Sequence, residues 1–166
     1  MSKLAILGGQ PEVKNTSDDI FMRNITKEME DAVLKVLHEW KMSATDITRE
    51  FERAFADWHG MKYGLGCNTG TSALHCAMFG AGIGVGDEVI VPSFSFIATA
   101  NAVLFNGAKP VFADVDPQTF NLNPESVLEK ITKKTKAIMP VHLFGLCAEI
   151  DRLKEICEDM DIRLIE

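Results

Sequence analysis

The chain has 166 residues, of which 46% are hydrophobic and 25% charged, proportions typical of a folded globular domain. Its formal net charge of -7 argues against nucleic acid or an anionic membrane surface as a partner, because either would repel it. Since no apolar run approaches the roughly 18 residues of a membrane span and the first residues are too few for a signal-peptide core, we expect a cytoplasmic protein.

Two amphipathic helices are predicted first, followed by an alternation of strands and helices. Apolar residues recur at helical spacing over residues 25–40, and again over residues 47–58 after a possible cap at Thr45 or Asp46. Short runs rich in β-branched residues then predict five strands, within residues 62–67, 88–92, 109–115, 135–143 and 162–166. Helices are predicted between them, at residues 72–81, 97–105 and 148–160 and after the cap at Asn123 and Pro124.

Strands that alternate with helices of this length predict an α/β fold. Each strand must cross over through a helix to reach the next, which gives a mostly parallel sheet sandwiched by helices. Ligands of such sheets gather at the carboxyl ends of the strands. The segments that leave those ends are therefore the candidate functional segments.

Residues 68–72, with the sequence NTGTS, combine a glycine, hydroxyl side chains and the start of a helix. Gly70 lets the backbone approach a ligand closely, and the amides of Thr71, Ser72 and Ala73 would be available to an anion at the helix amino end. A phosphate group suits this turn. A plain helix cap explains the same residues without any ligand.

A flat aromatic side chain, Phe96, follows the next predicted strand in the segment PSFSF. At the same edge of the sheet it could stack on a planar cofactor ring, although packing in the core is the simpler alternative. The four cysteines form no CxxC pair and no Cys/His ligand spacing, so we expect buried reduced thiols and neither zinc nor disulfides.

Three stretches of the chain, residues 45–74, 82–124 and 131–145, together resemble the DegT/DnrJ/StrS-type sugar aminotransferases, which are pyridoxal-phosphate enzymes of fold type I. The resemblance implies that residues 45–166 are the N-terminal part of the family's large, cofactor-binding domain, preceded by a helical segment at residues 1–44. It places the phosphate-binding turn on Gly70, Thr71 and Ser72 and the ring-stacking aromatic on Phe96. Pyridoxal 5'-phosphate is the implied cofactor.

The implied reaction transfers an amino group from glutamate or glutamine to a keto sugar or cyclitol, in a homodimer. Family members continue beyond the strand at residues 162–166 with an acidic residue that contacts the pyridine nitrogen, and later with the lysine that forms the Schiff base. We therefore expect no catalytic residue in these 166 residues and interpret them as a truncated, inactive portion of such an enzyme. Two alternatives stay open: a naturally short homologue that serves as a binding or assembly module, and a small flavodoxin-like α/β protein that binds a phosphorylated ligand.

Overall fold

The computed structural model describes residues 3, 7–10, 25–43 and 45–166. The chain divides into two compact units, Met1–Gly64 and Leu65–Glu166. The sequence-based boundary at residue 45 lies inside the first unit and stays a prediction, because most of residues 1–24 lie outside the described residues. None of the described helices is long and apolar enough to cross a membrane.

The first unit contains the two predicted helices, α1 (Lys27–His38) and α2 (Asp46–Trp58). The Thr26 hydroxyl caps α1 by accepting a hydrogen bond of 3.3 Å from the Met29 amide. Thr45 precedes α2, but its hydroxyl donates to the Lys41 carbonyl instead of capping the helix. Ala56 is the one buried hydrophobic residue among those described in the two helices.

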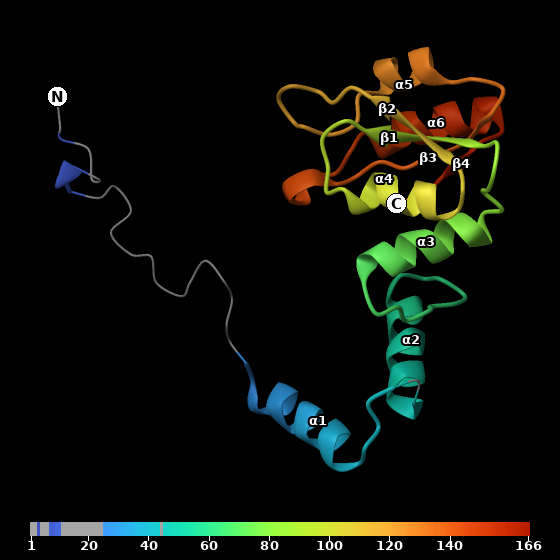
Figure 1. Cartoon of the computed structure of the whole chain (residues 1–166). Helices are drawn as coiled ribbons and strands as arrows, with labels where there is room; N and C mark the ends of the chain where they lie inside the picture. The colour runs from blue at the N-terminus through green and yellow to red at the C-terminus, as the bar shows by residue number, and fades with distance from the viewer. Residues whose placement is uncertain (1–2, 4–6, 11–24, 44) are drawn as a thin grey trace. The chain divides into compact units, whose positions relative to one another are not determined.

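The second unit is built on a parallel sheet of four strands in the order β2-β1-β3-β4 (Figure 1). This arrangement confirms the predicted α/β class and four of the five predicted strands. The strands are β1 (Glu88–Pro92), β2 (Lys109–Ala113), β3 (Thr135–Ile138) and β4 (Arg163–Leu164), and the helices are α3 (Gly70–Gly80), α4 (Ala98–Phe105), α5 (Pro124–Lys130) and α6 (Ile150–Met160).

Two apolar clusters cover the two faces of the sheet, as the alternation of side chains along a strand requires. In β1, Ile90 points into one cluster with Val127 of α5 and Leu153 of α6. Its neighbour Val89 points into the other cluster, with Met78 of α3 and Val103 of α4 among its members. The sheet is therefore sandwiched by helices, with α3 and α4 on one face and α5 and α6 on the other.

The predicted strand at residues 62–67 is wrong. These residues lie outside regular secondary structure, and none of the four strands of the described sheet pairs with them. A Cβ atom on Gly64 would lie 2.5 Å from the Glu52 carbonyl oxygen, so the backbone here runs against α2. Glycines at 64 and 66 also weaken any strand, because glycine has no side chain to pack and loses more entropy on ordering.

The expectation of buried thiols holds for one cysteine of four. Cys157 is buried in the α6 side of the core, and this burial raises the pKa of its thiol to about 11. The other three cysteines, Cys67, Cys76 and Cys147, are exposed. Two of these lie on or beside α3 and one lies in a loop, where the surrounding chain leaves the side chains open to solvent.

Candidate functional site

The amino end of α3 is organised by Thr69, the residue before Gly70. Its hydroxyl oxygen accepts a hydrogen bond of 3.0 Å from the Ser72 amide, and the same hydroxyl donates to the Ser72 hydroxyl oxygen at 3.1 Å. Because Ser72 Oγ accepts this proton, its own hydroxyl hydrogen stays available to an anion. Sequence reasoning did not assign Thr69 to the site. The signal was a threonine three residues before a helical serine, at the position that favours helix caps.

The structure corrects the expected number of available amides at this turn. The Ser72 amide is taken by Thr69 Oγ1, and the Ala73 amide donates to the Thr69 carbonyl oxygen at 3.0 Å. Neither contact uses the amides of Gly70 or Thr71, which also belong to the first helical turn. The backbone donors offered to a ligand are therefore these two, at the positive end of the helix dipole.

Gly70 leaves open space in front of this turn. A Cβ built on it would meet no atom within 4 Å, and its φ lies outside the left-handed region, so neither packing nor backbone strain requires glycine there. What the missing side chain does provide is unobstructed access to the turn. A side chain at this position would fill the space that an anion needs.

Phe96 lies between β1 and α4, and its side chain is not part of the core. The residue is 76% exposed, so it does not pack in the core that these 166 residues form. Its carbonyl oxygen accepts from the Thr99 amide at 3.1 Å, and the hydroxyls of Ser95 and Thr99 are 2.9 Å apart, so the turn that presents the ring is held on both sides. Phe94 packs against Phe120 instead, with ring centroids 5.6 Å apart.

Helices α3 and α4 begin at the same edge of the sheet (Figure 1), and Phe96 lies two residues before α4 in the chain. Helix α4 follows β1 and so begins at the carboxyl end of that strand. Helix α3 precedes β1, so the carboxyl end of α3 leads to the amino end of that strand. The 11 residues of α3 span about 16 Å, which places the amino end of the helix toward the carboxyl end of β1. The two helices pack together, and Asn106 Nδ2 donates to the His75 carbonyl oxygen at 3.3 Å across them.

These features fit a phosphorylated planar ring. The α3 turn offers two backbone amides, a free hydroxyl hydrogen and open space, and Phe96 offers an exposed aromatic face at the same edge. Within the described part of the chain, no three His, Cys, Asp or Glu side chains gather as a metal site requires.

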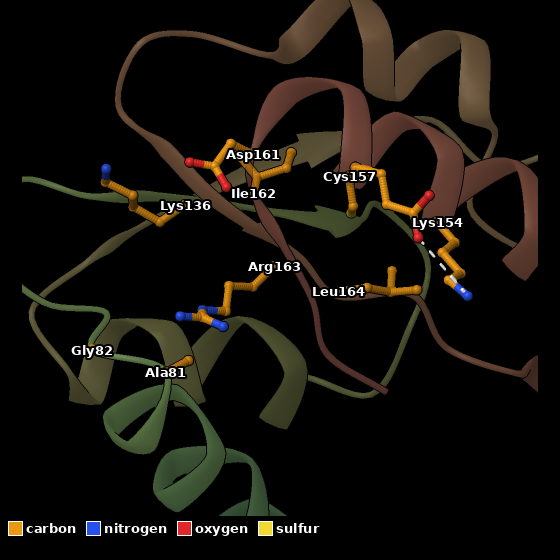
Figure 2. A pocket seen from close by; sticks show the side chains of 10 residues that line it. Ala81, Gly82, Lys136, Lys154, Cys157, Asp161, Ile162, Arg163 and Leu164 are labelled. Carbon is orange, nitrogen blue, oxygen red and sulfur yellow. Dashed lines mark ion pairs between the residues drawn. The ribbon is translucent and has the colours of Figure 1, made fainter.

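A separate cavity of about 680 Å³ lies at the opposite, amino edge of the sheet (Figure 2). Lys136 and Arg163, the residues near the starts of β3 and β4, line it together with the end of α6. Within the cavity lining, Lys154 Nζ forms an ion pair with Glu158 Oε1 at 3.8 Å. The cavity contains none of the residues that the sequence placed in the cofactor site.

Residues 23–166 match the model of the DegT/DnrJ/EryC1/StrS aminotransferase family. The chain belongs to this family. Membership overturns the flavodoxin-like alternative, which assumed no aminotransferase ancestry, and confirms the resemblance drawn from the sequence motifs.

Relatives of the chain include proteins named as aminotransferases or synthases, each more than twice its length. It is 49% identical over 127 residues to a GDP-perosamine synthase of Caulobacter vibrioides, which covers 76% of this chain and 34% of that protein. It is 44% identical over 118 residues to L-glutamine:2-deoxy-scyllo-inosose aminotransferase of Streptomyces fradiae, covering 71% of this chain and 28% of that protein. The crystal structure of NtdA from Bacillus subtilis, with bound cofactor PMP, aligns with a TM-score of 0.78 and 33% identity over 86% of this chain and 34% of that one. The chain thus spans about a third of the proteins it matches.

Proposed function

We propose that the amino end of α3 binds the phosphate group of pyridoxal 5'-phosphate and that Phe96 packs on the pyridine ring. One observation carries this proposal: an aminotransferase-family chain presents a 76% exposed phenylalanine at the sheet edge where an open, glycine-containing helix begins. The PMP bound in the related NtdA structure supports a cofactor of this class.

Each proposed site residue has one task. Gly70 keeps the turn open, while the Thr71 amide and the Ser72 hydroxyl donate hydrogen bonds to phosphate oxygens. Phe96 covers one face of the ring and excludes water from it. The bound cofactor would supply an electron-withdrawing ring, which is the chemistry an amino transfer needs.

For the whole protein, we propose amino transfer from glutamate or glutamine to a keto sugar or a keto cyclitol. Relatives support this substrate class, since one is named for a GDP-sugar product and one for an inosose substrate. The proposal places the acidic residue that contacts the pyridine and the Schiff-base lysine beyond Glu166, so residues 1–166 alone would be inactive. We also propose that the whole protein forms a homodimer and is located in the cytoplasm.

Absorbance spectra of the whole enzyme loaded with pyridoxal phosphate, including the acidic residue and the lysine proposed to follow Glu166, test the proposed reaction. Addition of glutamate or glutamine should convert the cofactor to its amine form, and a keto sugar should then restore the original spectrum. A cofactor that binds without responding to any amino donor would instead support the alternative of a non-catalytic binding or assembly module.

The phosphate turn has a matched test within one helix. Gly70 and Gly80 both lie in α3 with open space around their Cβ positions, one at each end of the helix. We expect Gly70→Val to weaken the binding of pyridoxal phosphate at least tenfold, because the new side chain occupies the anion position. Gly80→Val should leave the dissociation constant unchanged, and equal affinities in the two variants would reject the assignment.

A further inference from the structure

A loop at the carboxyl end of β3, residues 142–148, adopts an irregular conformation that side-chain contacts hold in place. It contains a short 3-10 turn, Leu143–Gly145, in which Phe144 has a φ of 53° and Gly145 a φ of 84°. A phenylalanine in the left-handed region is strained and persists only where surrounding contacts fix it. These contacts come from a residue more than twenty positions earlier in the chain.

Asn121 supplies the contacts. The residue is 5% exposed, and its side-chain amide makes three hydrogen bonds, all to this loop. Its Oδ1 accepts from the Leu143 amide at 3.0 Å, and its Nδ2 donates to the carbonyl oxygens of Leu146 at 3.0 Å and Cys147 at 3.2 Å. A buried amide with this many partners is strongly constrained, because a lost partner would leave polar atoms unsatisfied away from water.

The loop in turn fixes His142. The Ala148 amide donates to His142 Nδ1 at 3.1 Å, so this nitrogen acts as an acceptor and carries no hydrogen. The neutral imidazole must then carry its hydrogen on Nε2, which lies 2.9 Å from Glu166 Oε2. His142 Nε2 therefore donates to the Glu166 carboxylate. The contact joins the ends of two adjacent strands, β3 and β4.

Glu166 lies just beyond β4, on the α5 and α6 side of the sheet. The Ile165 amide donates to the Ile138 carbonyl oxygen at 3.0 Å, so pairing with β3 continues past the end of the strand. Leu164 packs with the cluster on the α5 and α6 side, whereas Ile165 packs with the cluster on the α3 and α4 side. Side chains alternate along a strand, which accounts for the orientation of Glu166 toward His142.

We propose that Asn121 and His142 are positioning residues that fix the carboxyl end of β4 through Glu166. Asn121 holds the loop, the loop holds one tautomer of His142, and the Nε2–H of His142 anchors the strand end. This inference rests on the proposed function, because it is at this edge of the sheet that the cofactor is placed. It adds a second set of residues, in the loop that follows β3 and just beyond β4, that keeps this edge rigid.

Nitrogen NMR of the histidine rings in the protein tests the first half of the proposal. Wild type should show His142 as a single tautomer with hydrogen on Nε2. Asn121→Ala should mix the two tautomers and speed hydrogen exchange of the Ala148 amide at least tenfold. Asn106→Ala is the matched control, because Asn106 also bonds two backbone carbonyls but in α3 and α4, and it should change neither signal. An unaltered His142 in Asn121→Ala, or the same change in Asn106→Ala, would overturn the proposal.

Substitutions of exposed Glu166 test the second half without threatening the core. Glu166→Ala should speed exchange of the Ile165 amide several-fold, while Glu166→Gln, which keeps an acceptor for His142 Nε2–H, should restore the wild-type rate. An equal hydrogen-exchange rate of the Ile165 amide in wild type, Glu166→Ala and Glu166→Gln would overturn the role of Glu166. The histidine NMR and the hydrogen-exchange measurements need no cofactor, so a negative result in either leaves the cofactor assignment intact. Conversely, a negative Gly70→Val titration would leave the roles of Asn121 and His142 intact.

Discussion

At the scale of single residues, Phe96 gives the most direct test of ring stacking. Phe96→Ala should weaken the binding of pyridoxal phosphate by about 1 kcal/mol, roughly fivefold, which is typical of an aromatic contact. Phe79, on α3, is 77% exposed and provides a control of equal exposure. A fluorescence titration should show a wild-type dissociation constant for Phe79→Ala. Loss of affinity in both variants alike would contradict a specific role for Phe96.

Glu88 links three segments and gives the stability of the second unit a pH dependence. The Thr132 hydroxyl donates to it at 2.6 Å and Lys109 at 3.1 Å, and together they hold the pKa of Glu88 below its ordinary value of 4.5. A lowered pKa means that the ionised form stabilises the fold above pH 4.5, and that this stabilisation is lost as the pH falls through the folded-state pKa.

Glu88→Gln should therefore lower the free energy of unfolding at pH 7, and the difference from wild type should shrink in acid. Urea unfolding at pH 7 and at pH 3 measures both values. Glu129→Gln, at an exposed position on α5, serves as the control and should behave as wild type. If the difference in the free energy of unfolding between Glu88→Gln and wild type grew below pH 4.5, the stabilising role of ionised Glu88 would be contradicted.

Cys157 should be the slowest cysteine to react. Its thiol is buried and its pKa is raised to about 11, whereas the reactive species is the thiolate. Iodoacetamide at pH 8 followed by peptide mass mapping should label the three exposed cysteines first. Early labelling of Cys157 in the folded protein would contradict its placement in the core.

Sequence reasoning located residues whose type and local spacing carry the information. Gly70 and Phe96 were predicted because each lies in a short motif beside a helix start. Asn121 was not, since its partners lie 22 to 26 positions away and only the folded loop brings them together. The engagement of the Ser72 amide was also missed, because it depends on the rotamer of Thr69.

At the scale of elements, the end of α4 depends on Gly107. Its φ is 74°, a conformation that costs an ordinary residue about 1–2 kcal/mol, and a Cβ would lie 2.8 Å from Val85 Cγ2. Gly107→Ala should lower the free energy of unfolding by about this amount. Gly80→Ala, in open space without positive φ, should be neutral or slightly stabilising in the same urea titration. Equal stability of the two variants would show that the backbone at residue 107 is not strained.

Helices and buried strands were predictable because their periodicity or composition is local. The segment at residues 62–67 was not, because a strand requires a neighbour and the apolar run alone cannot reveal whether one is present. Its two glycines were the available warning. The glycine at 64 instead reflects a close approach to α2.

At the scale of the whole molecule, alternation of strands and helices was sufficient to predict a parallel sheet with both faces covered. The order β2-β1-β3-β4 was not predicted, because it depends on which strands pair across long crossovers. Similar sheets serve unrelated functions, so the fold alone indicates no reaction, and it is the family match that supports the proposed amino transfer.

The affinity of the protein for pyridoxal phosphate relative to pyridoxal, which lacks the phosphate, tests the central claim most directly. Charge-assisted hydrogen bonds contribute about 1.5–3 kcal/mol each, so a phosphate held at the amino end of α3 should give more than a tenfold preference for pyridoxal phosphate. The same preference should be largely lost in Gly70→Val. Equal binding of the two compounds by the wild-type protein would contradict the claim that this turn recognises a phosphate.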